Sequence, residues 1–129
     1  MIIRYIENLK SMLYSSPVIE QVEIMVEEIT LATGVFRAKT TLVNSSELHI
    51  FEYIVLEGSN ITRQKYSYHW QNKYGELIKR YDNARHHPDL DNFPHHIHYP
   101  QNIEPSQDIG LSKVLENIEK EIGLEEANN

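Results

Sequence analysis

The sequence predicts an α+β fold: an antiparallel meander sheet of about five strands with an N-terminal and a C-terminal helix. Three observations favour this class. Apolar residues recur at helical spacing near both ends of the chain, and the segments between residues 22 and 82 have the composition of strands. The turns between those segments are too short for a parallel crossover. The length of 129 residues predicts a single domain, residues 1–129, able to bury a sizeable core.

The two predicted helices share an apolar stripe of period 3.6. Residues 2–13 form the first helix, which Ser15-Ser16-Pro17 ends. The second spans about residues 106–122, and Ser106 suits its N-cap. Residues 125–129 are expected to fray. The apolar positions that carry these predictions are Ile2, Ile3, Ile6, Leu9 and Leu13 in the first helix, and Ile109, Leu111, Val114, Leu115, Ile118 and Ile122 in the second.

Five strands are predicted between the helices. Val22, Ile24 and Val26 alternate with more polar residues, as in a half-buried strand. The next four segments, separated by turns that contain Gly or Asn, are residues 35–43, 47–57, 61–71 and 76–82.

Turn lengths predict the pairing of these strands and, from it, a row of charges. Arg37 would face Glu52, Glu52 would face Lys65, and Lys65 would face Asp82. The same face would carry Lys39, Ser67, His69 and Arg80 beside Leu48, Ile50 and Ile54, which suggests a partly covered groove wall. The alternative is cross-strand charge pairing for stability alone. The opposite face would hold an aromatic core of Phe51, Tyr53, Tyr66, Tyr68, Trp70 and Tyr81.

Residues 84–105 read as a long loop rich in histidine and proline, a type that is often functional. Three explanations of the histidines stay open. They could bind a metal together with Asp82, Asp89 or Asp91, although adjacent histidines on an extended chain point opposite ways. They could perform metal-free acid–base chemistry on RNA. They could also hold the loop through backbone hydrogen bonds.

Composition narrows the function classes. The absence of cysteine excludes disulfides, cysteine-ligated zinc and a cysteine nucleophile. A net charge of −7 argues against a protein that coats nucleic acid by charge alone, and leaves room for a local basic site. The first residues lack the apolar run of a signal peptide, so a cytoplasmic protein without membrane contact is expected.

Three motifs resemble the TumE family of small toxins from prokaryotic toxin–antitoxin pairs, over about residues 35–120. They are K-Y-S-Y-H-W-Q (65–71), G-E-L-I-K-R-Y-D-N-A-R-H-H-P (75–88) and F-P-H-H-I-H (93–98). Arg85 stands where the family commonly has Pro, and Ile97 where it often has Lys. The resemblance implies a cognate antitoxin as partner. It assigns no catalytic residue.

The residues themselves favour a metal-independent endoribonuclease with RNA as substrate. The expected catalytic residues are His69, His87, His95, His96, Lys65 and Arg80. The expected substrate-binding residues are Arg37, Glu52, Tyr68, Asp82, Arg85, His86 and His98. His49 lies outside the motif and is expected on the other face of the sheet.

The alternative function is a non-enzymatic module that binds a metal or the antitoxin. In that case zinc bound by His95 and His98 is the cofactor expected, whereas the leading hypothesis needs none. Oligomeric state stays open, with a dimer as one option.

Overall fold

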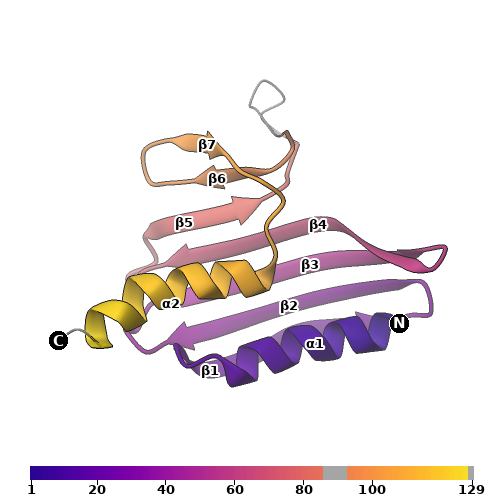
Figure 1. Cartoon of the computed structure of the whole chain (residues 1–129), viewed down its shortest axis with the longest axis horizontal. Coiled ribbons are helices and arrows are strands. Elements are labelled where there is room, and N and C mark those ends of the chain that lie inside the picture. Colours follow the sequence, from indigo (N-terminus) through magenta and orange to yellow (C-terminus); the bar gives the residue numbers. More distant parts are fainter. Residues whose placement is uncertain (86–92, 128–129) are drawn as a thin grey trace.

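The computed structural model describes residues 1–85 and 93–127, and its main element is a seven-stranded antiparallel sheet (Figure 1). The strands lie side by side in chain order. They are β1 (Ile19–Ile29), β2 (Thr33–Leu42), β3 (Glu47–Glu57), β4 (Asn60–Gln71), β5 (Leu77–Asp82), β6 (His96–His98) and β7 (Ile103–Pro105). The α+β class with an antiparallel sheet is confirmed.

The sheet has more strands than the predicted five or so. The five predicted strands correspond to β1 to β5, whereas β6 and β7 lie inside the segment predicted to be a loop. Each of the two is three residues long and contains histidine or proline, so neither is long enough to show the alternation by which a strand is recognised.

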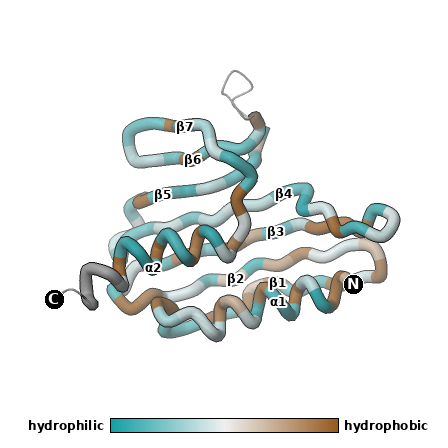
Figure 2. The backbone as a smooth tube through the Cα atoms, viewed as in Figure 1, coloured by the Kyte–Doolittle hydropathy of each residue, from teal (hydrophilic) through white to brown (hydrophobic). Residues whose placement is uncertain are grey.

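Both predicted helices are present, as α1 (Ile2–Ser15) and α2 (Leu111–Ala127). The predicted bounds of the second were wrong: α2 begins at Leu111, so Ser106 is not its N-cap, and it continues to Ala127, into the tail that was expected to fray. They pack on the same face of the sheet (Figure 1), which we call the helix-covered face. Apolar residues recur along both helices and along β2 and β3 (Figure 2). The residues buried from the helices are Ile2, Ile6, Leu9, Leu13, Leu111, Val114, Leu115, Ile118 and Ile122. Within the described part of the chain, no helix is long and apolar enough to cross a membrane.

The predicted charged row is wrong. Arg37 pairs with Phe51, Phe51 with Ser67, and Ser67 with Asp82. The β2–β3 hairpin is offset by one residue from the predicted register. The β3–β4 hairpin starts in the predicted register, with Leu56 opposite Ile61, and shifts by one at an irregularity beside Tyr53.

Successive side chains of a strand point to opposite faces of the sheet. These two offsets therefore place each β3 side chain on the face opposite to the predicted one, while the side chains of β2 and β4 stay on their predicted faces. Tyr66, Tyr68, Trp70 and Tyr81 are buried, as predicted. In β3 the residues that lie in the core are Leu48, Ile50 and Ile54. Their strand neighbours, including Phe51 and Tyr53, therefore point to the other face, which we call the open face.

Candidate functional site

A basic hollow of about 420 Å³ lies on the open face, over β2 to β5. Its lining includes four basic residues, Arg37, Lys65, Arg80 and Arg85, and one acidic residue, Asp82. The remaining lining residues are Phe51, Gln64, Tyr66, Ser67, Asn83 and Ala84. A chain with a net charge of −7 thus gathers four cations in one place, which favours an anionic ligand there.

A second hollow of about 280 Å³ adjoins the first, since both are lined by Arg37, Phe51, Ser67 and Arg80. We call the two together the groove. Its further lining residues include His49 and His69. The Arg37 guanidinium lies 4.1 Å from the centre of the Phe51 ring. An aromatic ring and several cations on one surface can hold a base and a phosphate respectively.

His69 faces Arg80 across the β4–β5 pair. Its Nδ1 lies 3.3 Å from Arg80 Nη1, and its Nε2 lies 3.0 Å from Gln71 Oε1. Because a guanidinium only donates, these contacts suit a neutral ring that accepts at Nδ1 and donates at Nε2. Burial and the charge of Arg80 lower the pKa of His69. A histidine that is neutral near pH 7 can accept a proton from a substrate.

His49 lines the groove, whereas it was predicted on the other face of the sheet. It pairs with His69 in the β3–β4 ladder, and the two ring centres are 5.9 Å apart. Its Nε2 lies 2.9 Å from Glu47 Oε1, and this hydrogen bond lowers the pKa of Glu47. The alternation of Leu48, Ile50 and Ile54 in β3 was the signal that could have placed His49 outward.

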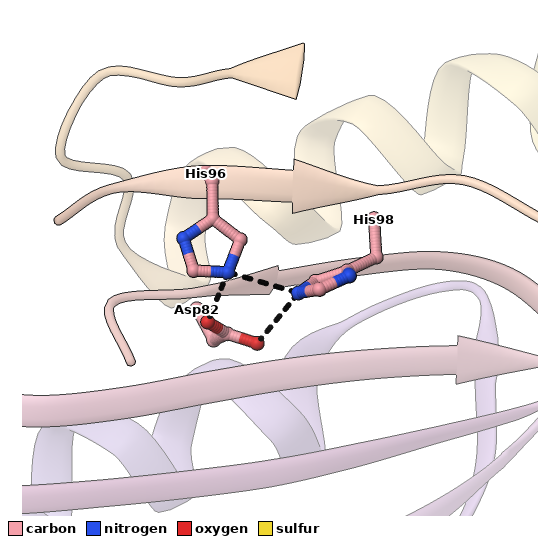
Figure 3. A group of neighbouring side chains, drawn as sticks. All are labelled: Asp82, His96 and His98. Carbon is pink, nitrogen blue, oxygen red and sulfur yellow. Dashed lines mark hydrogen bonds and ion pairs between the residues drawn. The ribbon is translucent and has the colours of Figure 1, made fainter. Parts of the chain in front are cut away.

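At the β5–β6 end of the sheet, Asp82, His96 and His98 form a compact cluster (Figure 3). His96 Nε2 lies 2.7 Å from Asp82 Oδ1 and 2.9 Å from His98 Nε2. His98 Nε2 lies 3.5 Å from Asp82 Oδ2. Asp82 and His96 are buried, and His98 is partly exposed. These residues are close enough to hold a metal ion together.

Arg80 connects this cluster to the groove. Its Nε donates to Asp82 Oδ2 at 2.8 Å, while its Nη1 reaches His69. The strand pairing explains the arrangement, because Arg80 lies between His69 on β4 and His98 on β6. The side chain of Arg80 is therefore held from two sides within the open face.

His95 lies on the other side of the sheet from this cluster. Its ring stacks on Tyr66, 5.9 Å between centres, and its Nδ1 is 3.1 Å from the Tyr66 hydroxyl. The expected zinc pair of His95 and His98 is therefore wrong, because the two rings face opposite sides of the sheet. Asp82 and His96 are the residues that meet His98.

Glu52 and Tyr68, both expected to bind substrate, belong to the core. Glu52 is 1% exposed and Tyr68 is 0% exposed. The Glu52 carboxylate accepts hydrogen bonds from the hydroxyls of Tyr5 in α1, at 2.5 Å, and Tyr68, at 2.8 Å. Arg63 donates to the Tyr68 oxygen at 2.6 Å and pairs with Asp108 just before α2. This network joins the helices to the sheet, and its residues do not line the groove.

Two more of the expected site residues, His86 and His87, lie outside the described residues, as do Asp89 and Asp91. Trp70 is buried, as predicted, and donates its Nε1 hydrogen to Ser46 Oγ at 2.9 Å.

Comparison with known proteins gives one match. A family model described as Toxin TumE matches residues 8–125, which is nearly the whole chain. No curated protein and no solved structure matches the sequence.

Proposed function

The chain belongs to the TumE family of toxins, and on that basis we propose that it is the toxin of a toxin–antitoxin pair. We propose further that it acts as an endoribonuclease. The groove is the observation that supports an RNA substrate. Four basic residues line a hollow beside two histidines, in a protein whose net charge is negative. A phosphodiester is an abundant anion that such a site would bind, and histidines next to it can move the protons of a cleavage reaction.

In the proposed reaction Arg80 turns from His69 to the phosphate, and the Nδ1 lone pair of His69 that it releases accepts the proton of a ribose 2′-hydroxyl. The oxygen then attacks the adjacent phosphorus, the bond from phosphorus to the 5′-oxygen breaks, and His49 donates a proton to that leaving oxygen. The products are a 2′,3′-cyclic phosphate and a free 5′-hydroxyl. Arg37, Arg80 and Lys65 bind the phosphate and stabilise the charge that develops on its oxygens. The chemical step uses no metal ion.

The other expected catalytic histidines take different places in this proposal. His96 is buried and touches Asp82 and His98, so it acts as a positioning residue behind Arg80. His95 lies on the helix-covered side and takes no part. Phe51, which lines both hollows of the groove, is the aromatic residue proposed to stack on a base.

The test of cleavage uses purified protein and an end-labelled RNA in the presence of EDTA. His69→Ala and His49→Ala should each reduce the rate by roughly a hundred-fold or more, the usual contribution of an acid or a base. His95→Gln is the histidine control. Arg37→Ala should slow cleavage because it removes a cation that binds the phosphate, and Lys113→Ala, which removes an exposed cation from α2, is its control. Circular dichroism shows whether each variant is folded.

Two results would overturn the nuclease assignment. One is a folded wild-type protein that arrests growth and yet leaves every RNA intact. The other is full cleavage by both folded histidine variants. The pairing is tested separately: expression of this chain alone should arrest a bacterial host, and co-expression of the neighbouring gene should relieve the arrest.

A non-enzymatic binding module is the second candidate. The convergence of Asp82, His96 and His98 favours it, since a cluster of this kind can bind an ion without any reaction. Growth arrest without RNA cleavage would move this candidate ahead.

A further inference from the structure

We propose that Asp82, His96 and His98 bind one divalent transition-metal ion of the zinc class. This site is separate from the groove histidines, and the proposal goes beyond the proposed function. Figure 3 shows the two imidazole rings and the carboxylate turned toward one another from the paired strands β5 and β6.

The donor separations fit a single ion. With bonds of about 2.1 Å to nitrogen and oxygen, neighbouring donors of one ion lie about 3.0 to 3.4 Å apart. His96 Nε2 lies 2.7 Å from Asp82 Oδ1 and 2.9 Å from His98 Nε2, and His98 Nε2 lies 3.5 Å from the other carboxylate oxygen, Oδ2. A small rotation of the carboxylate and of the two rings would bring both nitrogens and one carboxylate oxygen to bonding distance of one ion.

The hydrogen bonding of His96 leaves Nε2 as the ring nitrogen that a cation among these donors would meet. Its Nδ1 lies 2.8 Å from the carbonyl oxygen of Pro94, which only accepts, so Nδ1 carries a hydrogen. In the neutral ring Nε2 then presents a lone pair, and it points toward the Asp82 carboxylate and toward Nε2 of His98. A proton on Nε2 of His96 could be shared with only one of these partners, the Asp82 carboxylate or Nε2 of His98. A metal ion would bind all three donors at once.

The surroundings have the arrangement typical of metal sites. A metal-binding histidine usually donates its second N–H to a carbonyl or carboxylate, and a metal-binding carboxylate usually accepts further hydrogen bonds. His96 has such a contact with Pro94. Asp82 accepts from the Arg80 guanidinium at 2.8 Å and from the Ala84 backbone N–H at 3.1 Å.

The donor set selects the class of ion. Two imidazoles and one carboxylate suit Zn²⁺, Co²⁺ and Fe²⁺, whereas Mg²⁺ and Ca²⁺ prefer oxygen ligands alone. His98 keeps 26% of its side-chain surface exposed, so the cluster meets solvent at His98.

The experiment uses tag-free protein that has been stripped with EDTA and titrated with Co²⁺. The wild type should bind one equivalent and develop the visible absorption of a Co²⁺ ion with fewer than six ligands, which Zn²⁺ should then abolish. Asp82→Asn and His98→Ala should each weaken binding by more than the roughly 10–100-fold loss typical of outer-shell changes. His95→Gln, which alters the neighbouring histidine on the other side of the sheet, should bind like the wild type.

Absence of saturable binding by the folded wild type would overturn the proposal, as would unchanged binding by both folded ligand variants. If those variants do not fold, nitrogen NMR of the wild type decides. Zn²⁺ should then shift the Nε2 resonances of His96 and His98 and leave those of His95 unchanged. Shifts at His95 instead would overturn the ligand set. No RNA is present in these measurements, so their outcome is independent of the cleavage assay.

Discussion

Tyr68→Phe tests whether the Glu52 network holds the fold together or contacts a substrate. The substitution removes one buried hydroxyl that donates to Glu52 at 2.8 Å and accepts from Arg63 at 2.6 Å. Burial and the neighbouring carboxylate raise the pKa of Tyr68, so the hydroxyl keeps its proton as a donor. Phenylalanine retains the ring and its packing. The variant therefore isolates two hydrogen bonds to charged groups.

The expected loss of stability follows from those two contacts. A hydrogen bond to a charged group contributes about 1.5–3 kcal/mol, and an unpaired buried partner adds to the loss when it is removed. Two such bonds give a decrease of roughly 3–6 kcal/mol in the free energy of unfolding. This is a large share of the 5–15 kcal/mol typical of a domain. At about 4 °C per kcal/mol for a chain of this size, the melting temperature should fall by about 12 °C or more.

Urea denaturation at neutral pH measures this free energy. Tyr53→Phe on the open face is the matched control and should change the free energy of unfolding by less than about 0.5 kcal/mol. A loss below about 1 kcal/mol for Tyr68→Phe, or one equal to the control, would refute the reasoning. Full stability combined with lost RNA cleavage would instead return Tyr68 to the substrate site.

Three further predictions concern other parts of the structure. Burial raises the pKa of Glu52 above 4.5, so the native state binds this proton more tightly than the unfolded chain does, and ionised Glu52 destabilises the fold. The free energy of unfolding of Glu52→Gln relative to the wild type should therefore increase as the pH rises through and above 4.5. Urea denaturation at several pH values measures this difference. Gly34→Ala would place a Cβ 2.9 Å from Ile54 Cγ1 and should cost about 1–3 kcal/mol by overpacking, measured by thermal unfolding. In the pH–rate profile of RNA cleavage, the acid limb of His69 should lie below 6.5, and Arg80→Gln should move it upward by removing a positive charge.

The two helices and the identity of five strands could be predicted from the sequence because both signals are local. Ile6 and Leu9 repeat on one helical face, and Gly58 and Gly75, both at positive φ, mark turns between strands. The aromatic core of β4 was also predicted correctly. Each of these features depends on residues a few positions apart, so the periodicity of the chain already contains it.

The faces of β3 could not be predicted from turn lengths, since a one-residue offset in a hairpin turns every side chain to the other side. The turn lengths predicted that Glu52 belongs to a charged row. In the structure Tyr5 and Tyr68 make its burial tolerable by hydrogen bonding both carboxylate oxygens. One of these partners comes from α1, far from β3 in the sequence.

The composition of the candidate site was decided by tertiary structure. The sequence determined that histidines and basic residues are abundant near the motif, while strand pairing selected those that meet. His49 joins His69 through the β3–β4 ladder, and His96 and His98 reach Asp82 because β6 pairs with β5. Such pairings form when the whole sheet packs its apolar face against the two helices. The free energy of that packing comes from the entire core, so no local pattern within the motif predicts which side chains it brings together.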